Sequence, residues 1–333
     1  MTHLARRRML AAATAGLLSA ALGVATAPAT AAPRTATASA CKLFTLPYPA
    51  DVYRADAQAI DRTGRFIAGT ALRRGEDSNQ LLLLLWKRGR LTTIESPLAD
   101  TVADVNTAGT VVGYGWIDAK IRPWILRDGA VALLPSPPGG AEPTAINGAG
   151  DIVGHGVDSD TGDLFPVRWP AARPGTFEVL DAPAGATPQG ITEDGTIVGT
   201  AGEFAAWTGW VRYPDGRLQA LTVPGARSTN VDAAQGHWAI GRVSLGGANQ
   251  VRVRWDLRDG SWSRLADELN WLGDVNKRGT VVGGDRIARG GGSRLLPGGG
   301  AGVGVGARAI SDTGTVVGFR NDGRVTPVRW TGC

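Results

Sequence analysis

Short apolar runs alternate with polar and glycine positions along most of this chain, and one ten-residue pattern recurs. In "AINGAGDIVG" (145–154) the apolar Ile146 is followed by Asn147, by Gly150, and then by a β-branched pair and a second glycine. Short polar side chains accept hydrogen bonds from nearby backbone N–H groups and so initiate turns, and glycine adopts a positive φ without steric penalty. The pattern therefore predicts a β-hairpin. Its apolar residue recurs as Ile60, Val105, Ile146, Ile191, Val231, Val275 and Ile310.

The residue after each apolar position is again a turn former, and successive hairpins lie 35 to 45 residues apart. These turn formers are Asp61, Asn106, Asn147, Thr192, Asp232, Asn276 and Ser311. We interpret them as turn initiators and not as a ring of ligands. The β-branched pairs that follow are interpreted as core.

Two further strands are predicted in each unit. A β-branched or aromatic run comes first, and it is followed by a short turn and a fourth strand such as "LTTI" or "LQALTVP". The third-strand runs are "LLLLLW" (81–86), "RPWIL" (122–126), "FPVRW" (165–169), "GWVRY" (209–213), "VRVRW" (251–255) and "TPVRW" (326–330). Four short strands, repeated at this period, predict an all-β, seven-bladed β-propeller with four-stranded blades.

Two details refine this expectation. Four tryptophans recur at one position of the third strand and are expected to pack between blades: Trp86, Trp169, Trp255 and Trp330. The sixth unit, at 283–307, is rich in glycine and has no "VRW" run, so we expect blade six to be short or irregular.

The openings, of the form Ala-Ile-Asn-x-x-Gly-x-Val-Val-Gly, resemble those of the extracellular HAF-repeat family. The resemblance covers nearly the whole chain after its first forty residues, although "PVRW" and "PWIL" stand where that family has His-Ala-Phe. It implies a secreted, β-propeller-like repeat protein and no particular chemistry.

The N-terminal segment has the features of an export signal. Basic "MTHLARRRML" precedes a small-residue apolar stretch, so we assign 1–31 to a signal peptide, and Arg6-Arg7 also suits the twin-arginine type. We expect 32–40 to be a disordered linker and 41–333 a single secreted β-propeller domain. No later segment is long and apolar enough to span a membrane. Without the three signal arginines, the formal charge falls from +5 to 5 − 3 = +2, which argues against nucleic acid as a partner.

The two chain ends are expected to complete the last blade together. The seventh unit stops after its third strand, and "KLFTLP" (42–47) fits the missing fourth strand, so it should pair beside 326–330. This pairing brings Cys41 and Cys333 to the same turn, and these are the only cysteines. We predict a Cys41–Cys333 disulfide, as suits an exported chain. The alternative is that "ASAC" (38–41) is a lipidation signal at Cys41.

Candidate catalytic chemistry is scarce. After the signal only His155 and His237 remain, and the chain has no Cys-x-x-Cys spacing and no Gly-x-Ser-x-Gly motif. The string "DSDTGDLF" places Asp158, Asp160 and Asp163 at alternating positions, as in a calcium loop. We favour a solvated acidic loop, and we predict no catalytic residue, metal or cofactor.

The best candidate for a binding surface is the face that carries the blade-to-blade loops and the loops between second and third strands. Aromatic and charged residues that do not follow the repeat gather there, as they do in carbohydrate and peptide sites. The predicted ligand-binding residues are Tyr53, Arg73, Trp116, Asp118, Glu203, Trp207 and Trp271. Neighbouring Arg74 and Lys120 lie on the same predicted loops.

These features lead to a functional prediction with alternatives. The leading hypothesis is a secreted, monomeric, non-catalytic binding or scaffold propeller that presents a ligand surface for an extracellular glycan or protein over its central funnel. One alternative is a structural cell-envelope protein. The other is a glycosidase or lyase, which requires two carboxylates that converge near the axis.

Overall fold

The computed structural model describes residues 41–333 except 76–78, 99, 204–205, 247–249 and 300–301. The predicted signal peptide (1–31) and linker (32–40) lie outside the described residues. The seven occurrences of the hairpin pattern are called repeats one to seven below, in chain order. Among the described residues, no helix is long and apolar enough to cross a membrane.

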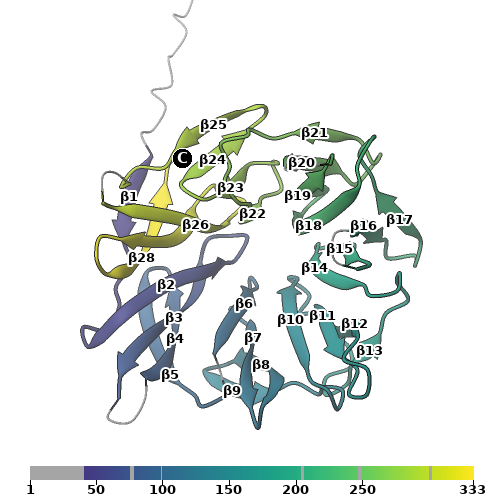
Figure 1. Cartoon of the computed structure of the whole chain (residues 1–333). Helices are drawn as coiled ribbons and strands as arrows, with labels where there is room; N and C mark the ends of the chain where they lie inside the picture. Colours follow the sequence, from purple (N-terminus) through teal and green to yellow (C-terminus); the bar gives the residue numbers. More distant parts are fainter. Residues whose placement is uncertain (1–40, 76–78, 99, 204–205, 247–249, 300–301) are drawn as a thin grey trace, which may run out of the picture. The chain divides into compact units, whose positions relative to one another are not determined.

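Repeats one to six each contribute four strands, and repeat seven contributes three. Figure 1 shows the first strand of each repeat nearest the common centre. The inner strands are β2 (Val52–Ile60), β6 (Thr101–Val105), β10 (Ala141–Ile146), β14 (Thr187–Ile191), β18 (Ser228–Gln235), β22 (Asp274–Val275) and β26 (Gly304–Ile310). The second strands are β3 (Phe66–Arg74), β7 (Val111–Ile117), β11 (Ile152–Val157), β15 (Ile197–Ala201), β19 (Trp238–Ser244), β23 (Val281–Gly283) and β27 (Val316–Asn321).

The outer half of each repeat follows the predicted order. The third strands are β4 (Asn79–Lys87), β8 (Lys120–Arg127), β12 (Leu164–Trp169), β16 (Thr208–Arg212), β20 (Gln250–Asp256), β24 (Arg286–Arg289) and β28 (Val325–Thr331). The outermost strands are β5 (Arg90–Glu95), β9 (Ala130–Leu133), β13 (Glu178–Val179), β17 (Leu218–Leu221), β21 (Trp262–Arg264), β25 (Gly292–Leu295) and, from the other end of the chain, β1 (Lys42–Thr45).

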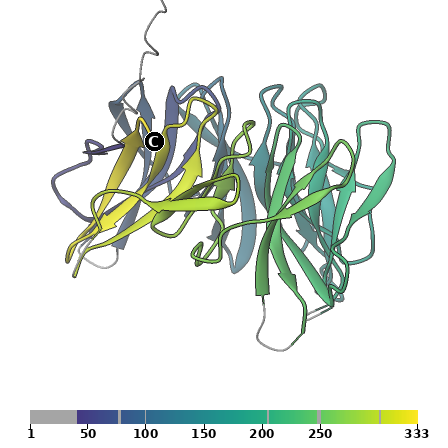
Figure 2. The same cartoon turned by 90° about the horizontal axis from the view of Figure 1, so that it is seen from above.

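The strands form antiparallel sheets that stand around the centre. Repeats two to six each make a four-stranded sheet. Repeats one and seven belong to one eight-stranded sheet, in which β28 and β2 are joined by a single parallel pairing of Arg54 with Val325. Figure 2, a quarter turn away, shows the strands running from one face of this arrangement to the other. The all-β class and the four-stranded sheets were predicted correctly.

A β-bulge in the inner strand explains the second glycine of the recurring pattern. Six inner strands have a register shift at the same place, for example between Pro143 and Ala145, where Thr144 is the extra residue. The shift presses the inner strand's backbone against the second strand. A Cβ on Gly154 would lie 2.1 Å from the carbonyl oxygen of Glu142, and equivalent glycines in the other repeats meet the same obstacle. Glycine is therefore required there by the bulge.

The turn formers act as predicted and also connect neighbouring repeats. The Asn147 Oδ1 accepts the N–H of Asp151 at 2.9 Å, and its Nδ2 donates to the carbonyl of Thr192 in the next repeat at 3.4 Å. Asn106 donates in the same way to the carbonyl of Asn147 at 3.2 Å. The same side chain thus builds its own turn and links it to the next one.

Repeat five departs from the predicted alignment. Ala234 pairs with Ala239 where Ile146 pairs with Ile152, so Ala234 and Gln235, and not Val231 and Asp232, occupy the apolar and turn positions. Asp232 is instead the bulge residue of this repeat. The prediction failed here because the turn is shorter, and the spacing of the glycine no longer marked the register.

Buried tryptophans join successive repeats, as predicted. Trp86, Trp169, Trp255 and Trp330 are at most 3% exposed. Each indole N–H donates to a backbone carbonyl just beyond the outermost strand that precedes it in the ring order, for example Trp169 to Pro135 at 2.7 Å and Trp330 to Pro297 at 2.8 Å. The tryptophan therefore fills the space between sheets and also satisfies its polar atom.

Repeat six is short, as expected, but its sheet is complete. Its strands have two to four residues each, and "RIAR" (286–289) forms the third strand that the sequence seemed to lack. Ile287 and Ala288 are buried there in place of the bulky "VRW" residues.

The two chain ends meet as predicted. β1 pairs antiparallel with β28, with Leu43 opposite Trp330, just as Leu91 lies opposite Trp86 in repeat one. Cys41 and Cys333 form a disulfide across 292 residues. The bond leaves no free thiol at Cys41, so the lipidation alternative does not fit this structure.

Candidate functional site

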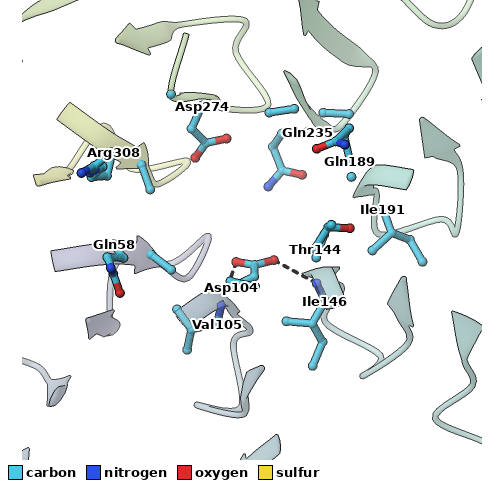
Figure 3. A pocket seen from close by; sticks show the side chains of 18 of the residues that line it. Gln58, Asp104, Val105, Thr144, Ile146, Gln189, Ile191, Gln235, Asp274 and Arg308 are labelled. Atoms are coloured by element: carbon cyan, nitrogen blue, oxygen red, sulfur yellow. Dashed lines mark hydrogen bonds between the residues drawn. The ribbon is translucent and has the colours of Figure 1, made fainter. Parts of the chain in front are cut away.

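A cavity of about 350 Å³ lies at the centre, and the inner strand region of every repeat contributes to its wall. We call it the axial cavity. Figure 3 shows side chains from different repeats pointing into it. The bulge residues are prominent among its lining: Gln58, Ala103, Thr144, Gln189, Asp232 and Arg308. The backbone bulge recurs from repeat to repeat, but the side chain at the bulge differs. The cavity therefore has a regular backbone wall that carries chemically different side chains.

Two carboxylates occupy the position directly after the bulge position in the inner strands of repeats two and six. Asp104 and Asp274 each precede the apolar residue of their hairpin, opposite Val112 and Val282 respectively. The other five repeats have a small residue at this position: Ala59, Ala145, Gly190, Ala233 and Ala309. In Figure 3, Asp104 and Asp274 point into the axial cavity from opposite sides.

Backbone N–H groups hold both carboxylates. Asp104 accepts the N–H of Val105 at 2.7 Å and that of Ile146 in the next repeat at 2.9 Å. Asp274 accepts the N–H groups of Val275 and Ile310 at the same two distances. The two side chains are therefore fixed in equivalent orientations, and each links two neighbouring repeats.

Burial raises the pKa of Asp104 to about 6 and that of Asp274 to about 7. The backbone hydrogen bonds and the charge of Arg62 oppose this rise, and the charge of Asp104 adds to it at Asp274. The two carboxyl groups thus influence each other across the cavity. Near neutral pH they can hold or release a proton, or accept hydrogen bonds from a cationic group.

Arg62 crosses the axial cavity near one end. It comes from the turn of repeat one and reaches across to repeats four and five. Its Nε lies 2.7 Å from Glu193, its guanidinium donates to the carbonyl of Ile191 at 3.3 Å, and it also contacts Gln235. These contacts cross the centre at the end where the inner hairpins turn.

At the other end, the contacts join neighbouring repeats. Glu142 interacts with the hydroxyl of Tyr114, and burial raises the pKa of Glu142. Arg308 pairs with the buried Asp56 at 3.3 Å. Burial lowers the pKa of His155, whose ring lies 3.9 Å from Glu142, so that a neutral imidazole is favoured there.

The residues predicted from sequence lie outside the axial cavity, because none of the seven belongs to its lining among the described residues. Arg73 pairs with Asp51 at 2.7 Å and with Glu95 at 3.1 Å, and Tyr53 lies under Arg74 at 5.7 Å. Trp271 lies 5.5 Å from the guanidinium of Arg308, which does line the cavity. Trp271 is thus the predicted residue linked to the axial site.

The remaining predicted residues are placed separately. Trp116 is 61% exposed at the end of β7, and Asp118 follows in the β7–β8 turn with a φ of 51°. Glu203 is exposed, and the Trp207 carbonyl accepts the N–H of Thr229 at 2.7 Å. The acidic loop at 158–163 behaves as a turn, since Asp158 accepts the N–H groups of Asp160 and Thr161.

Sequence reasoning missed Asp104, Asp274 and Arg62. A signal for the first two existed, because "ADVN" and "GDVN" carry aspartate where the other openings have alanine or glycine. The shared hairpin pattern around these positions hides the difference. Arg62 carried no signal, because contacts across the centre join residues more than a hundred positions apart.

The chain matches no protein-family model, and no curated protein resembles it in sequence. Solved structures do resemble it. For the β-propeller domain of the trilobed protease from Pyrococcus furiosus, the TM-score is 0.62 at 10% identity, over 85% of this chain and 96% of that one. For a prolyl endopeptidase, the TM-score is 0.59 at 13% identity, over 84% of this chain and 50% of that one. For a puromycin hydrolase, the TM-score is 0.54 at 14% identity, over 80% of this chain and 50% of that one.

These comparisons correct the functional prediction. The expected non-catalytic binding or scaffold protein was wrong, since the similar structures are propellers of peptidases and a related hydrolase. This chain spans about half the length of three of these enzymes, so the lack of a catalytic motif in a propeller sequence was no argument against a peptidase-type role. What the similarity establishes for this chain is the β-propeller fold.

Proposed function

We propose that this chain is the propeller of a peptidase-type system and that its axial cavity receives a peptide. The observation that carries the proposal is the single central cavity, to which the inner strand region of every repeat contributes. The similar peptidase propellers support a peptide as the substrate class; one of those structures, an acylaminoacyl peptidase, holds the ligand Z-Gly-Gly-Phe-chloromethyl ketone.

The proposal includes a ring of seven blades that is closed through both chain ends. Three contacts support closure. β1 pairs with β28, Arg54 of repeat one pairs with Val325 of repeat seven, and the Asp312 N–H donates to the Arg62 carbonyl at 2.9 Å. The Cys41–Cys333 disulfide holds the first of these contacts covalently. Such a bond persists in oxidising compartments, which supports a location outside the cytoplasm.

The lining of the cavity suits a peptide backbone. An extended peptide has no internal hydrogen bonds, so each of its N–H and C=O groups needs a partner when it leaves water. Gln58, Thr144 and Gln189 project donors and acceptors from three repeats. Gln58 Oε1 is buried with no hydrogen-bond partner, so it is an acceptor that a peptide N–H can satisfy.

Isothermal titration calorimetry with short unstructured peptides tests the proposal. Ala103→Trp fills the cavity from a bulge position, and we expect it to abolish binding without loss of folding. Val179→Trp is the matched control, because Val179 is 60% exposed on the short outer strand β13. If no peptide binds the wild-type chain, or if Ala103→Trp binds as well as Val179→Trp, the axial site is refuted.

A further inference from the structure

The axial cavity has one blocked end. Arg62 spans the centre from repeat one to repeats four and five, and its three contacts close the side on which the inner hairpins turn. The side chain is held firmly, since only 19% of it is exposed. A peptide that enters from the opposite side cannot pass through. The ligand of such a pocket is therefore a chain end and not an internal segment.

The charges of the lining distinguish between the two possible chain ends. Most charged groups around the cavity are already paired. Arg62 is balanced by Glu193, Arg308 by Asp56, and Asp232 by Arg242 at 2.8 Å. Asp104 and Asp274 accept backbone N–H groups instead. Among the described residues, neither of them forms an ion pair with a side-chain cation.

A carboxylate terminus would be repelled by these two groups, whereas an ammonium terminus would be attracted. Each Asp oxygen accepts one backbone hydrogen bond, and a carboxylate oxygen can accept more than one. An ammonium group has three donors, and the unpartnered Gln58 Oε1 is a third acceptor on the same wall. The acceptors therefore come from repeats one, two and six.

We propose that the axial cavity binds a primary ammonium group at the amino-terminal end of a peptide, between Asp104 and Asp274, with Arg62 as the stop beyond it. This inference rests on the proposed function, because it specifies which part of the peptide enters. A lysine side chain also carries a primary ammonium group. Such a side chain could reach the two carboxylates while its backbone stays outside the cavity, whereas a chain terminus brings its backbone into the cavity.

Three peptides separate these cases by calorimetry at about pH 7.5, where both carboxylates are more than half ionised. The amino terminus of a peptide, with an ordinary pKa of about 8, is still mostly protonated at this pH. They are tetra-alanine, N-acetyl-tetra-alanine, and N-acetyl-Ala-Lys-Ala-Ala. We expect tetra-alanine to bind at least about tenfold more tightly than its acetylated form, as for loss of one charge-assisted hydrogen bond. We expect the acetylated lysine peptide to bind as weakly as acetylated tetra-alanine.

The double variant Asp104→Asn, Asp274→Asn should bind the free and acetylated peptides equally. Each asparagine keeps an oxygen for one of the two backbone N–H groups and loses the acceptor for the other, so circular dichroism must first show that the double variant is folded. Asp163→Asn is the control, since this carboxylate is exposed and does not line the cavity, and it should keep the tenfold preference.

Equal binding of free and acetylated tetra-alanine by the wild-type chain would overturn the inference and leave the proposed function intact. Tight binding of the acetylated lysine peptide would overturn the chain-terminus assignment. If none of the three peptides binds, and Ala103→Trp changes nothing, the proposed function fails together with the inference.

The stop is tested separately with the same N-acetyl-Ala-Lys-Ala-Ala, which keeps an ammonium group but has a cap and a residue ahead of it. Arg62→Ala should admit these extra groups and bind this peptide at least about tenfold more tightly than the wild type does. Arg278→Ala, which removes an exposed arginine from the equivalent turn of repeat six, should not. Equal exclusion by Arg62→Ala and Arg278→Ala would show that Arg62 does not close the pocket.

Discussion

The turn position and the bulge position lie only three residues apart in each inner hairpin, and they differ in how much the sequence varies. At the turn stand Asp61, Asn106, Asn147, Thr192, Gln235, Asn276 and Ser311, all polar and all at most 7% exposed. At the bulge stand residues as different as Ala103, Thr144 and Arg308.

The difference follows from what each position must satisfy. A turn side chain replaces backbone hydrogen bonds in a buried place, so few residue types can serve. A bulge side chain faces the axial cavity, where the backbone imposes no chemical requirement. The repeat therefore keeps the groups that build its hairpin and is free to vary the groups that line the cavity.

The largest effect is expected from the glycine that faces the bulge. Gly154→Ala places a Cβ within 2.1 Å of a backbone oxygen, so we expect the free energy of unfolding to fall by about 3 kcal/mol, near the upper range for overpacking. Chemical denaturation measures it. Gly292→Ala is the control, because a Cβ there meets no atom within 4 Å. Equal stability of the two variants would contradict the account of the bulge.

A smaller loss is expected at the turn. Asn147→Ala removes the acceptor for the Asp151 N–H and the donor to Thr192, both in a buried place, and should cost about 2 kcal/mol. Denaturant titration against the wild type checks this value. If Asn147→Ala cost less free energy of unfolding than Gln189→Ala, a substitution at a bulge position, the distinction between the two positions would fail.

The pH dependence of stability tests the two exceptional carboxylates. Their folded-state pKa values, about 6 and about 7, lie above the ordinary 3.8, so the folded chain holds protons that the unfolded chain releases. Their contribution to stability is therefore full at low pH and is lost as the pH rises toward 7. The Asp104→Asn, Asp274→Asn variant should lose this decline, which is on the order of 1 kcal/mol for each unit by which a pKa is raised.

The charge of Arg62 lowers the pKa of both carboxyl groups, and the charge of Glu193 raises that of Asp104. Thermal unfolding of wild type and double variant across this pH range measures the difference, with Asp163→Asn, which changes an exposed carboxylate, as the control. Parallel curves for wild type and double variant would show that Asp104 and Asp274 do not titrate as described.

The smallest effect is expected at the bulge itself. Gln189→Ala should change the free energy of unfolding by no more than about 0.5 kcal/mol, because its side chain faces the cavity. The same variant should weaken peptide binding, which calorimetry can measure on the same sample. A large loss of stability would mean that the bulge side chains support the ring as well.

The sequence by itself was sufficient for most of the strands, their order and the pairing of the chain ends, but not for the third strand of repeat six. Each of these depends on local patterns: a turn former before a glycine, a β-branched run, or a fourth strand missing from one end and present at the other. Leu43 beside Trp330 and the Cys41–Cys333 bond could be predicted because repeat one supplies a template for repeat seven. The resemblance to HAF repeats stays a prediction.

Only the tertiary structure decided what the centre contains. The bulge left no mark that distinguishes Thr144 from any other strand residue, and the register of repeat five depended on a shorter turn. Asp104 and Asp274 are 170 positions apart, and Arg62 meets Gln235 across 173. Local patterns determine each hairpin, because its hydrogen bonds join near neighbours in the chain. The axial site exists only once all the inner strands surround the same space.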